Sequence, residues 1–146
     1  MSCFGNPLSA PFDWILGKWL IERTIPGTAM ICGTADVALL PSGEALYQEQ
    51  VTVALESGKT LLGRCSYRHR RMEDGFVILF AETSYVFQTL QFHPLGEDLI
   101  AEAQHACALD LYCSEYVLRA NGGFTIRHSV RGPRKNYVIA TELRRA

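Results

Sequence analysis

The stretch that decides the fold covers residues 19–40 and reads WLIERTIPGTAMICGTADVALL. Apolar and polar side chains alternate over residues 19–25 and again over residues 30–40, and Pro26-Gly27 stands between the two runs. Alternation with a period of two is typical of a half-buried β-strand, and Pro-Gly is a turn signal. The stretch therefore predicts two strands joined by a short turn, with Trp19, Ile21 and Arg23 on one face of the first strand.

The same pattern recurs along the rest of the chain. Eight more runs of strand character follow, separated by turns rich in Gly, Pro, Asn or Asp. Their ranges are 45–55, 61–71, 76–81, 86–92, 99–107, 109–119, 124–131 and 136–144. Because no amphipathic helix lies between them, the pattern predicts an antiparallel meander. We expect an all-β fold, an antiparallel up-and-down β-barrel of about 8–10 strands, with a two-sheet sandwich as the alternative.

The N-terminal segment is predicted to carry a short helical turn. Residues 1–8 have the composition of a tail, and Ser9 is a candidate cap for a turn over residues 11–15 that ends at Gly17. The whole chain, residues 1–146, has the length of a single domain with one core.

Composition excludes several classes of protein. Fourteen Lys and Arg against 15 Asp and Glu give a formal charge of −1, so nucleic acid is not expected as a partner. No stretch has the length or character of a membrane span or a signal peptide, so no membrane partner is expected. Five cysteines without paired short spacings predict free thiols and a cytoplasmic location. The oligomeric state, a homodimer included, stays open.

Two polar stretches interrupt the later strands, HACALDLY at residues 105–112 and RGPRKNY at residues 131–137. His105 and Cys107 share the face of Leu99, so alternation predicts that both point inside, where a buried polar group needs a partner or a ligand. Two readings stay open for Asp110 with Tyr112, a corner that fixes the strand or part of a site. The Gly-Pro-Arg-Lys turn is predicted to lie at a rim, with its cations facing solvent or an anion.

Further polar residues fall on inward registers of other strands. For residues 61–71 either face can be internal, so the sequence does not decide between Arg64 and Tyr67. These side chains either line a polar pocket or are satisfied separately in the core. The candidate ligand-binding residues are Arg23, Tyr47, Glu49, Arg64, Tyr67, His105, Cys107, Asp110, Tyr112, His128, Arg134 and Lys135.

A resemblance to a known superfamily supports the barrel. Gly17-Lys-Trp19, placed after a helical turn, resembles the G-x-W signature of the calycins, which comprise lipocalins, fatty-acid-binding proteins and nitrobindin-like barrels. Together with the polar motifs above and Tyr47-Gln-Glu49, it looks like a family of small calycin-like proteins without a known activity. The resemblance implies a barrel with a cavity, and it implies that these polar positions form its site.

The sequence differs from two of the calycin families at positions that those families use for binding. Residues 20–25 lack the two further glycines of the nitrobindin-like pattern, which argues against haem. Arg134 and Tyr137 are spaced differently from the R-x-Y pair with which fatty-acid-binding proteins hold a carboxylate.

The sequence therefore predicts a barrel that binds a small, partly apolar, anionic ligand. The Glu49 carboxylate would repel an anionic ligand unless Arg23 or Arg64 neutralises the carboxylate or the carboxyl is protonated. The alternative function is a cofactor-free isomerase, lyase or decarboxylase that uses Tyr47, Glu49 and His105, and the third is a structural or protein-interaction barrel. No cofactor is expected, and no metal is expected because no four-ligand set is visible.

Overall fold

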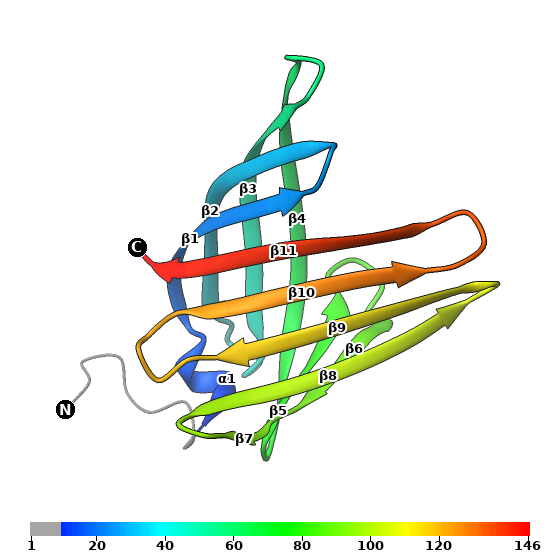
Figure 1. Ribbon diagram of the computed structural model, residues 1–146. Helices are drawn as coiled ribbons and strands as arrows, with labels where there is room; N and C mark the ends of the chain where they lie inside the picture. Colours follow the sequence, from blue (N-terminus) through cyan, green and yellow to red (C-terminus); the bar gives the residue numbers. More distant parts are fainter. Residues whose placement is uncertain (1–9) are drawn as a thin grey trace.

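The computed structural model of the protein describes residues 10–146, apart from the side chain of Cys107. The predicted tail and the Ser9 cap lie outside the described residues. The helical turn α1 and eleven strands follow one another along the chain (Figure 1). Their bounds are α1 Pro11–Trp14, β1 Gly17–Ile25, β2 Ala29–Leu39, β3 Ala45–Leu55, β4 Thr60–Met72, β5 Gly75–Phe80, β6 Val86–Gln91, β7 His93–Leu95, β8 Asp98–Cys107, β9 Asp110–Leu118, β10 Phe124–Arg131 and β11 Asn136–Arg145.

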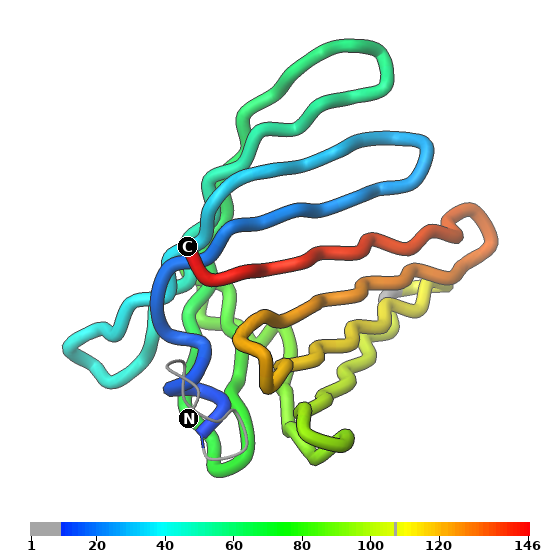
Figure 2. Tube along the Cα trace, turned by 60° about the vertical axis from the view of Figure 1, so that its left-hand side comes forward, coloured from blue at the N-terminus to red at the C-terminus, as the bar shows by residue number. Residues whose placement is uncertain are grey.

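The strands form one sheet in the order β6-β5-β4-β3-β2-β1-β11-β10-β9-β8-β7. Every hydrogen-bonded pair is antiparallel, and every pair except β1–β11 joins strands that are consecutive in sequence. The sheet curls until β6 contacts β8, which leaves a nearly closed up-and-down barrel (Figures 1 and 2). The predicted fold class is confirmed.

The strand count exceeds the prediction because of β7. The stretch between the predicted strands 86–92 and 99–107, which contains Pro94 and Gly96, counts as a turn in the sequence, but residues 93–95 pair with β8 before the chain turns. Proline has no amide hydrogen to donate, so it fits a three-residue strand at the edge of a sheet.

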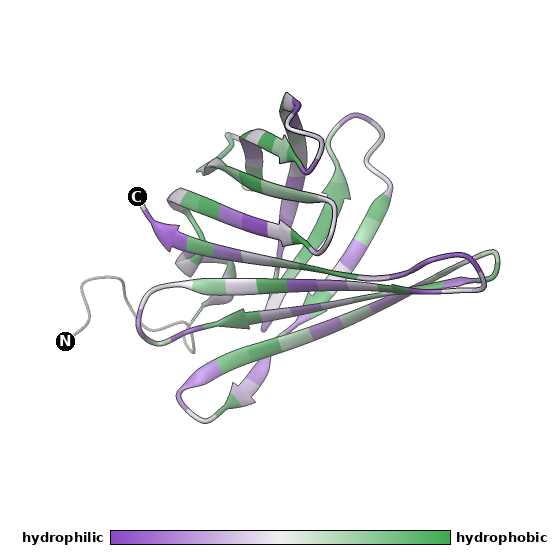
Figure 3. Cartoon of the chain, turned by 45° about the horizontal axis from the view of Figure 1, so that its top comes forward, coloured by the Kyte–Doolittle hydropathy of each residue, from purple (hydrophilic) through white to green (hydrophobic). Residues whose placement is uncertain are grey.

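The chain alternates in hydropathy along its strands, as Figure 3 shows, and residues of α1 belong to the core cluster on the apolar inner face. The side chain of Trp19 is fully buried there, and its indole N–H donates to the carbonyl of Ile15 at 2.9 Å. Its ring meets that of Phe124 edge to face, with centroids 4.6 Å apart. We call Trp19, Phe124, Phe12 and Leu143 the apolar plug. It closes the end of the barrel that α1 covers.

Strand register settles the face of residues 61–71. Glu49 pairs with Cys65 and Tyr47 pairs with Tyr67, so the face that carries Cys65 and Tyr67 lies inside. Arg64 alternates with them and is exposed on the outer face. Among the described residues, no helix is long and apolar enough to cross a bilayer.

Candidate functional site

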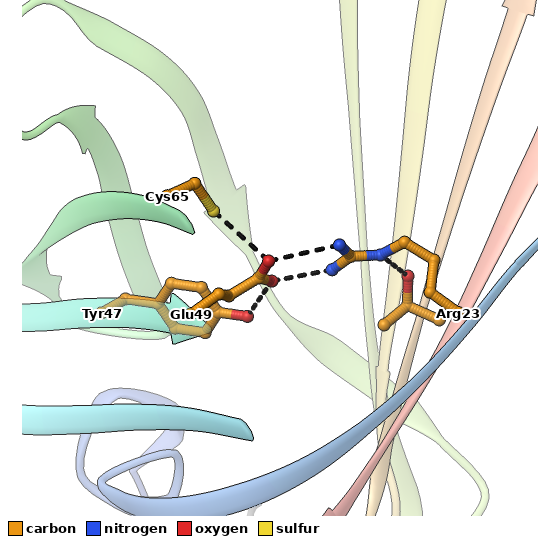
Figure 4. Close-up of polar contacts among 5 residues, drawn as sticks. Arg23, Tyr47, Glu49 and Cys65 are labelled. Carbon is orange, nitrogen blue, oxygen red and sulfur yellow. Dashed lines mark hydrogen bonds and ion pairs between the residues drawn. The ribbon is translucent and has the colours of Figure 1, made fainter. Parts of the chain in front are cut away.

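A polar cluster lies inside the barrel, beyond the apolar plug. Arg23 on β1 donates two hydrogen bonds to Glu49 on β3, from Nη2 to Oε1 at 2.7 Å and from Nη1 to Oε2 at 3.2 Å (Figure 4). The Tyr47 hydroxyl donates to Oε1 at 2.5 Å, and the Cys65 thiol donates to Oε2 at 3.3 Å. Arg23 Nε donates to Thr141 Oγ1 on β11 at 2.8 Å. We call these five residues the Arg23 cluster.

The Arg23 cluster fixes the protonation of its members. Burial opposes ionisation of Glu49, but the hydrogen bonds and charge of Arg23 outweigh it and hold the pKa of the carboxyl below its usual value. Burial, followed by the neighbouring Glu49 charge, raises the pKa of Tyr47 well above its usual value and that of Cys65 to about 12. The cluster therefore holds an ionised carboxylate surrounded by four donors.

A second chain of hydrogen bonds lies inside the barrel. Gln88 Nε2 on β6 donates to Ser114 Oγ on β9, and that oxygen lies 2.7 Å from Nδ1 of His128 on β10. The Gln88 side chain crosses the seam at which the sheet does not close, since β6 is one edge of the sheet. We call these three residues the Gln88 relay.

The Gln88 relay carries a neutral imidazole and an unpaired amide oxygen. Burial, followed by the charge of Arg23, lowers the pKa of His128 to about 4, so its ring is uncharged at pH 7. Gln88 Oε1 is buried and has no hydrogen-bond partner among the described residues. The Tyr116 ring stands edge-on to that of His128, with centroids 6.4 Å apart. Tyr116 is buried, and desolvation raises its pKa.

Tyr67 lies inside as well, in an aromatic group between β4 and β6. Its ring stacks on that of Phe87, with centroids 5.5 Å apart, and approaches that of Tyr47 at 6.4 Å. Desolvation raises the pKa of Tyr67, so its hydroxyl stays protonated. Arg64, on the outer face, does not join either polar group, which corrects its inclusion among the cavity residues.

The predicted residues of the 105–112 and 131–137 stretches lie together at the opposite end from α1. Lys135 Nζ is 3.8 Å from Asp110 Oδ2 and 3.4 Å from the Tyr112 hydroxyl. The His105 ring is 6.4 Å from that of Tyr112, and Arg134 is exposed in the neighbouring turn. These residues form a rim rather than an interior.

The prediction that His105 points into a buried interior is wrong. Leu99 and Ala101 on the same face of β8 are buried, but the side chain of His105, further along, is exposed. The β8–β9 hairpin turns at the end of the barrel away from α1, as Figure 1 shows, and His105 lies near that turn. The inward placement of Cys107 lies outside the described side chains.

A metal site is not evident in the described part of the chain. No group of three or more His, Cys, Asp and Glu side chains lies close enough there to hold an ion. His128 is hydrogen-bonded to Ser114, whereas His105 stands at the rim, so these two histidines occupy different surroundings. The polar groups described in the interior are the Arg23–Glu49 ion pair and several neutral hydrogen-bonding side chains.

Comparisons with known proteins give a family and a likeness of fold. A model of the family of unknown function DUF6314 matches residues 15–145. No curated protein matches this sequence.

Three solved structures of designed proteins are similar. The redesigned β-barrel mFAP1 bound to DFHBI has a TM-score of 0.48 and 12% identity, over 94% of this chain and 99% of that one. EF1p2_mFAP2b bound to DFHBI has a TM-score of 0.48 and 9% identity, over 95% and 99%. A fluorescence-activating β-barrel designed de novo has a TM-score of 0.43 and 12% identity, over 95% and 98%.

Proposed function

Since the chain belongs to DUF6314, a family of unknown function, we propose its role from the barrel interior: the protein binds a small, partly apolar molecule there. One observation carries the proposal. Polar side chains from seven strands face one another inside the barrel, in the Arg23 cluster and the Gln88 relay. Ligand sites of this kind combine apolar walls with a few placed polar groups. The proposal agrees with the resemblance to calycin barrels.

Energetics favour recognition over a purely structural role. A buried ion pair contributes less stability than apolar residues of the same volume, because both charges lose their hydration. Glu49 is 6% exposed and Arg23 is 19% exposed, so much of that hydration is lost here. The apolar plug already supplies a core. A polar interior beyond the plug is therefore better explained by a molecule that it recognises.

The charge balance of the interior favours an uncharged ligand. The sequence suggested an anion, with Arg23 as its counterion. In the fold the charge of Arg23 is offset by Glu49 at 2.7 Å, and His128 is neutral. An anion entering the site would lose its hydration and would gain no unpaired cation from these residues. We therefore propose that the bound molecule carries an uncharged hydrogen-bonding group on an apolar body.

Binding is favoured over acid–base catalysis by the protonation of the candidate groups. A general acid or base works best with a pKa near the operating pH. Glu49 is held ionised by four donors, and the pKa of Tyr47 is raised well above its usual value. His105, the third candidate, stands at the rim away from both. Glu49 and Tyr47 therefore keep fixed protonation states and are poorly suited to proton transfer.

Native mass spectrometry of purified protein, followed by calorimetric titration with naphthalene carboxamide, naphthoate and naphthylmethylamine, tests the proposal. In the double variant Arg23→Met/Glu49→Leu the Arg23 cluster becomes apolar, and we expect at least a tenfold loss of affinity for the bound compounds. Arg64→Met, on the outer face, is the matched control and should bind like the parent. Equal affinities in the parent and the double variant, or no bound molecule in either assay, would contradict the proposal.

A further inference from the structure

The Gln88 relay contains a buried polar group that the fold leaves unpaired. Gln88 is 7% exposed, and its side-chain amide has one partner, Ser114, on its nitrogen. The amide oxygen has none among the described residues. Nearly all buried polar atoms in proteins are hydrogen-bonded, and an exception inside a barrel indicates a missing partner. This orphaned oxygen is independent of the Arg23 cluster.

Proton counting shows what the missing partner must offer. Ser114 Oγ accepts from Gln88, so its own proton is available for Nδ1 of His128, and the neutral ring then carries its proton on Nε2. The relay ends in an acceptor, Gln88 Oε1, and a donor, His128 Nε2–H. If every bond in the relay is reversed, the amide end becomes the donor and the imidazole end the acceptor. Either polarity leaves a free acceptor at one end of the relay and a free donor at the other, beside a second amide hydrogen of Gln88.

The two free ends belong to side chains that share one partner. Gln88 and His128 both bond to the same Ser114 oxygen, which brings the two side chains together inside the barrel. The Tyr116 ring beside His128 and Leu90, the next inward residue on β6, supply apolar surface around it. The surroundings of the Gln88 relay therefore combine polar atoms without a partner and apolar side chains.

We propose that the Gln88 relay is the subsite for a carboxamide or lactam of the ligand. Such a group carries a donor and an acceptor side by side and satisfies both ends of the relay at once. A carboxylate offers only acceptors and an ammonium only donors, so each leaves one end unpaired. This inference rests on the proposed binding function, and it names the chemical class that the site takes.

The test compares four probes that share one apolar body: naphthalene-2-carboxamide, 2-naphthoate, methyl 2-naphthoate and 2-naphthylmethylamine. Affinities are measured by calorimetry at pH 7. In the parent protein the carboxamide should bind at least about tenfold more tightly than the other three, the effect of one unpaired buried hydrogen bond. In Gln88→Leu that preference should fall to about twofold or less.

Matched variants keep the outcome clear. Thr89→Ala, on the exposed face of the same strand, should keep the full preference. Ser114→Ala removes the atom that joins the relay and should also abolish the preference, which decides the matter if Gln88→Leu fails to fold. Binding of the probes without a carboxamide preference, or a preference unchanged in both relay variants, overturns this inference and leaves the proposed function standing. Failure of all four probes to bind, with no co-purified molecule, overturns both.

Discussion

Arg23 and Glu49 form a two-point ion pair between strands that are not neighbours. Arg23 lies on β1 and Glu49 on β3, with β2 between them, and their nitrogen–oxygen distances are 2.7 and 3.2 Å. On the inner face of β2, Ile31 pairs with Arg23 and Ala35 pairs with Glu49, and Gly33 lies midway between these two positions. Because Gly33 has no side chain, it leaves space through which the long Arg23 side chain reaches across the strand.

Removing one partner of this pair should cost more than removing both. Arg23→Met leaves a buried carboxylate without its cation, and Glu49→Leu leaves a buried guanidinium, so each should lower the free energy of unfolding by about 3 kcal/mol. The double variant should lose less than either single variant, because it leaves no unpaired charge in the interior. Urea unfolding of the four proteins measures the coupling. Additive losses would show that the pair is not coupled in solution.

Gly33→Ala should destabilise the protein by more than about 1 kcal/mol, because a Cβ at this position would lie 2.1 Å from the backbone oxygen of Gln50. Gly63→Ala is the matched control. It faces the same Val51 side chain from the other neighbouring strand, and its Cβ would lie 3.1 Å from a Val51 methyl group, which can move. Thermal unfolding of both variants checks the difference, and equal melting temperatures would contradict it.

Much of the fold could be predicted because the physics of each strand is local. Alternation over residues 19–25 and 30–40 and the Pro-Gly turn between them depend on neighbours in sequence, and they gave β1 and β2 to within two residues at each end. β7 was missed because Pro94 and Gly96 favour a turn. Its pairing with β8 depends on where the chain reverses direction, which local propensity does not give.

The candidate site was predicted only where alternation decides it. Arg23, Tyr47 and Glu49 were placed inside by their registers, and they meet in one cluster. Alternation gives the face of a side chain but not how far the core extends along a strand, which is why His105 was misplaced. Gln88 and Ser114 were missed because amides and hydroxyls are common on strands, and their contact depends on the curl that brings β6 near β9.

Trp19→Ala should lower the free energy of unfolding by about 3–5 kcal/mol, as large aromatic deletions in cores do. Trp19→Phe keeps the aromatic contact with Phe124 but leaves the buried Ile15 carbonyl without its donor, so it should cost about 1–2 kcal/mol. Urea unfolding compares both with Tyr85→Ala, an exposed control that should stay within about 0.5 kcal/mol of the parent. A loss for Trp19→Phe as large as that for Trp19→Ala would contradict the predicted order.

Cys65 should resist alkylation in the folded protein. Burial and the adjacent Glu49 carboxylate raise its pKa to about 12, and the thiolate is the reactive form, so at pH 8 its rate should be about a thousandfold below that of an ordinary thiol. Cys32 is exposed and serves as the internal comparison. Peptide mapping after timed iodoacetamide treatment measures both rates, and denaturant should bring them together. Rapid modification of Cys65 in the folded state would contradict its burial beside the Glu49 carboxylate.

The stability of the protein should fall in mild acid, in part through His69. Its ring is 4% exposed and stacks between those of Tyr47 and Phe76, and its Nδ1 has no hydrogen-bond partner among the described residues. Desolvation lowers its pKa from 6.5 to about 4. Between pH 6.5 and pH 4 the imidazole is therefore protonated in the unfolded chain and neutral in the folded protein. The contribution is complete above pH 6.5 and is lost as the pH falls toward 4, by roughly 3 kcal/mol.

His69→Phe separates this effect from the other acid-sensitive groups, because it keeps the stacked aromatic ring and removes the titration. His128, whose pKa is also lowered to about 4, and the paired carboxylates remain in the variant and continue to lower its stability in acid. Urea unfolding at pH 7.5 and at pH 4 should therefore show a smaller loss for His69→Phe than for the parent, by roughly 3 kcal/mol. Equal losses in the two proteins would mean that the imidazole of His69 gains a partner or solvent in the folded state.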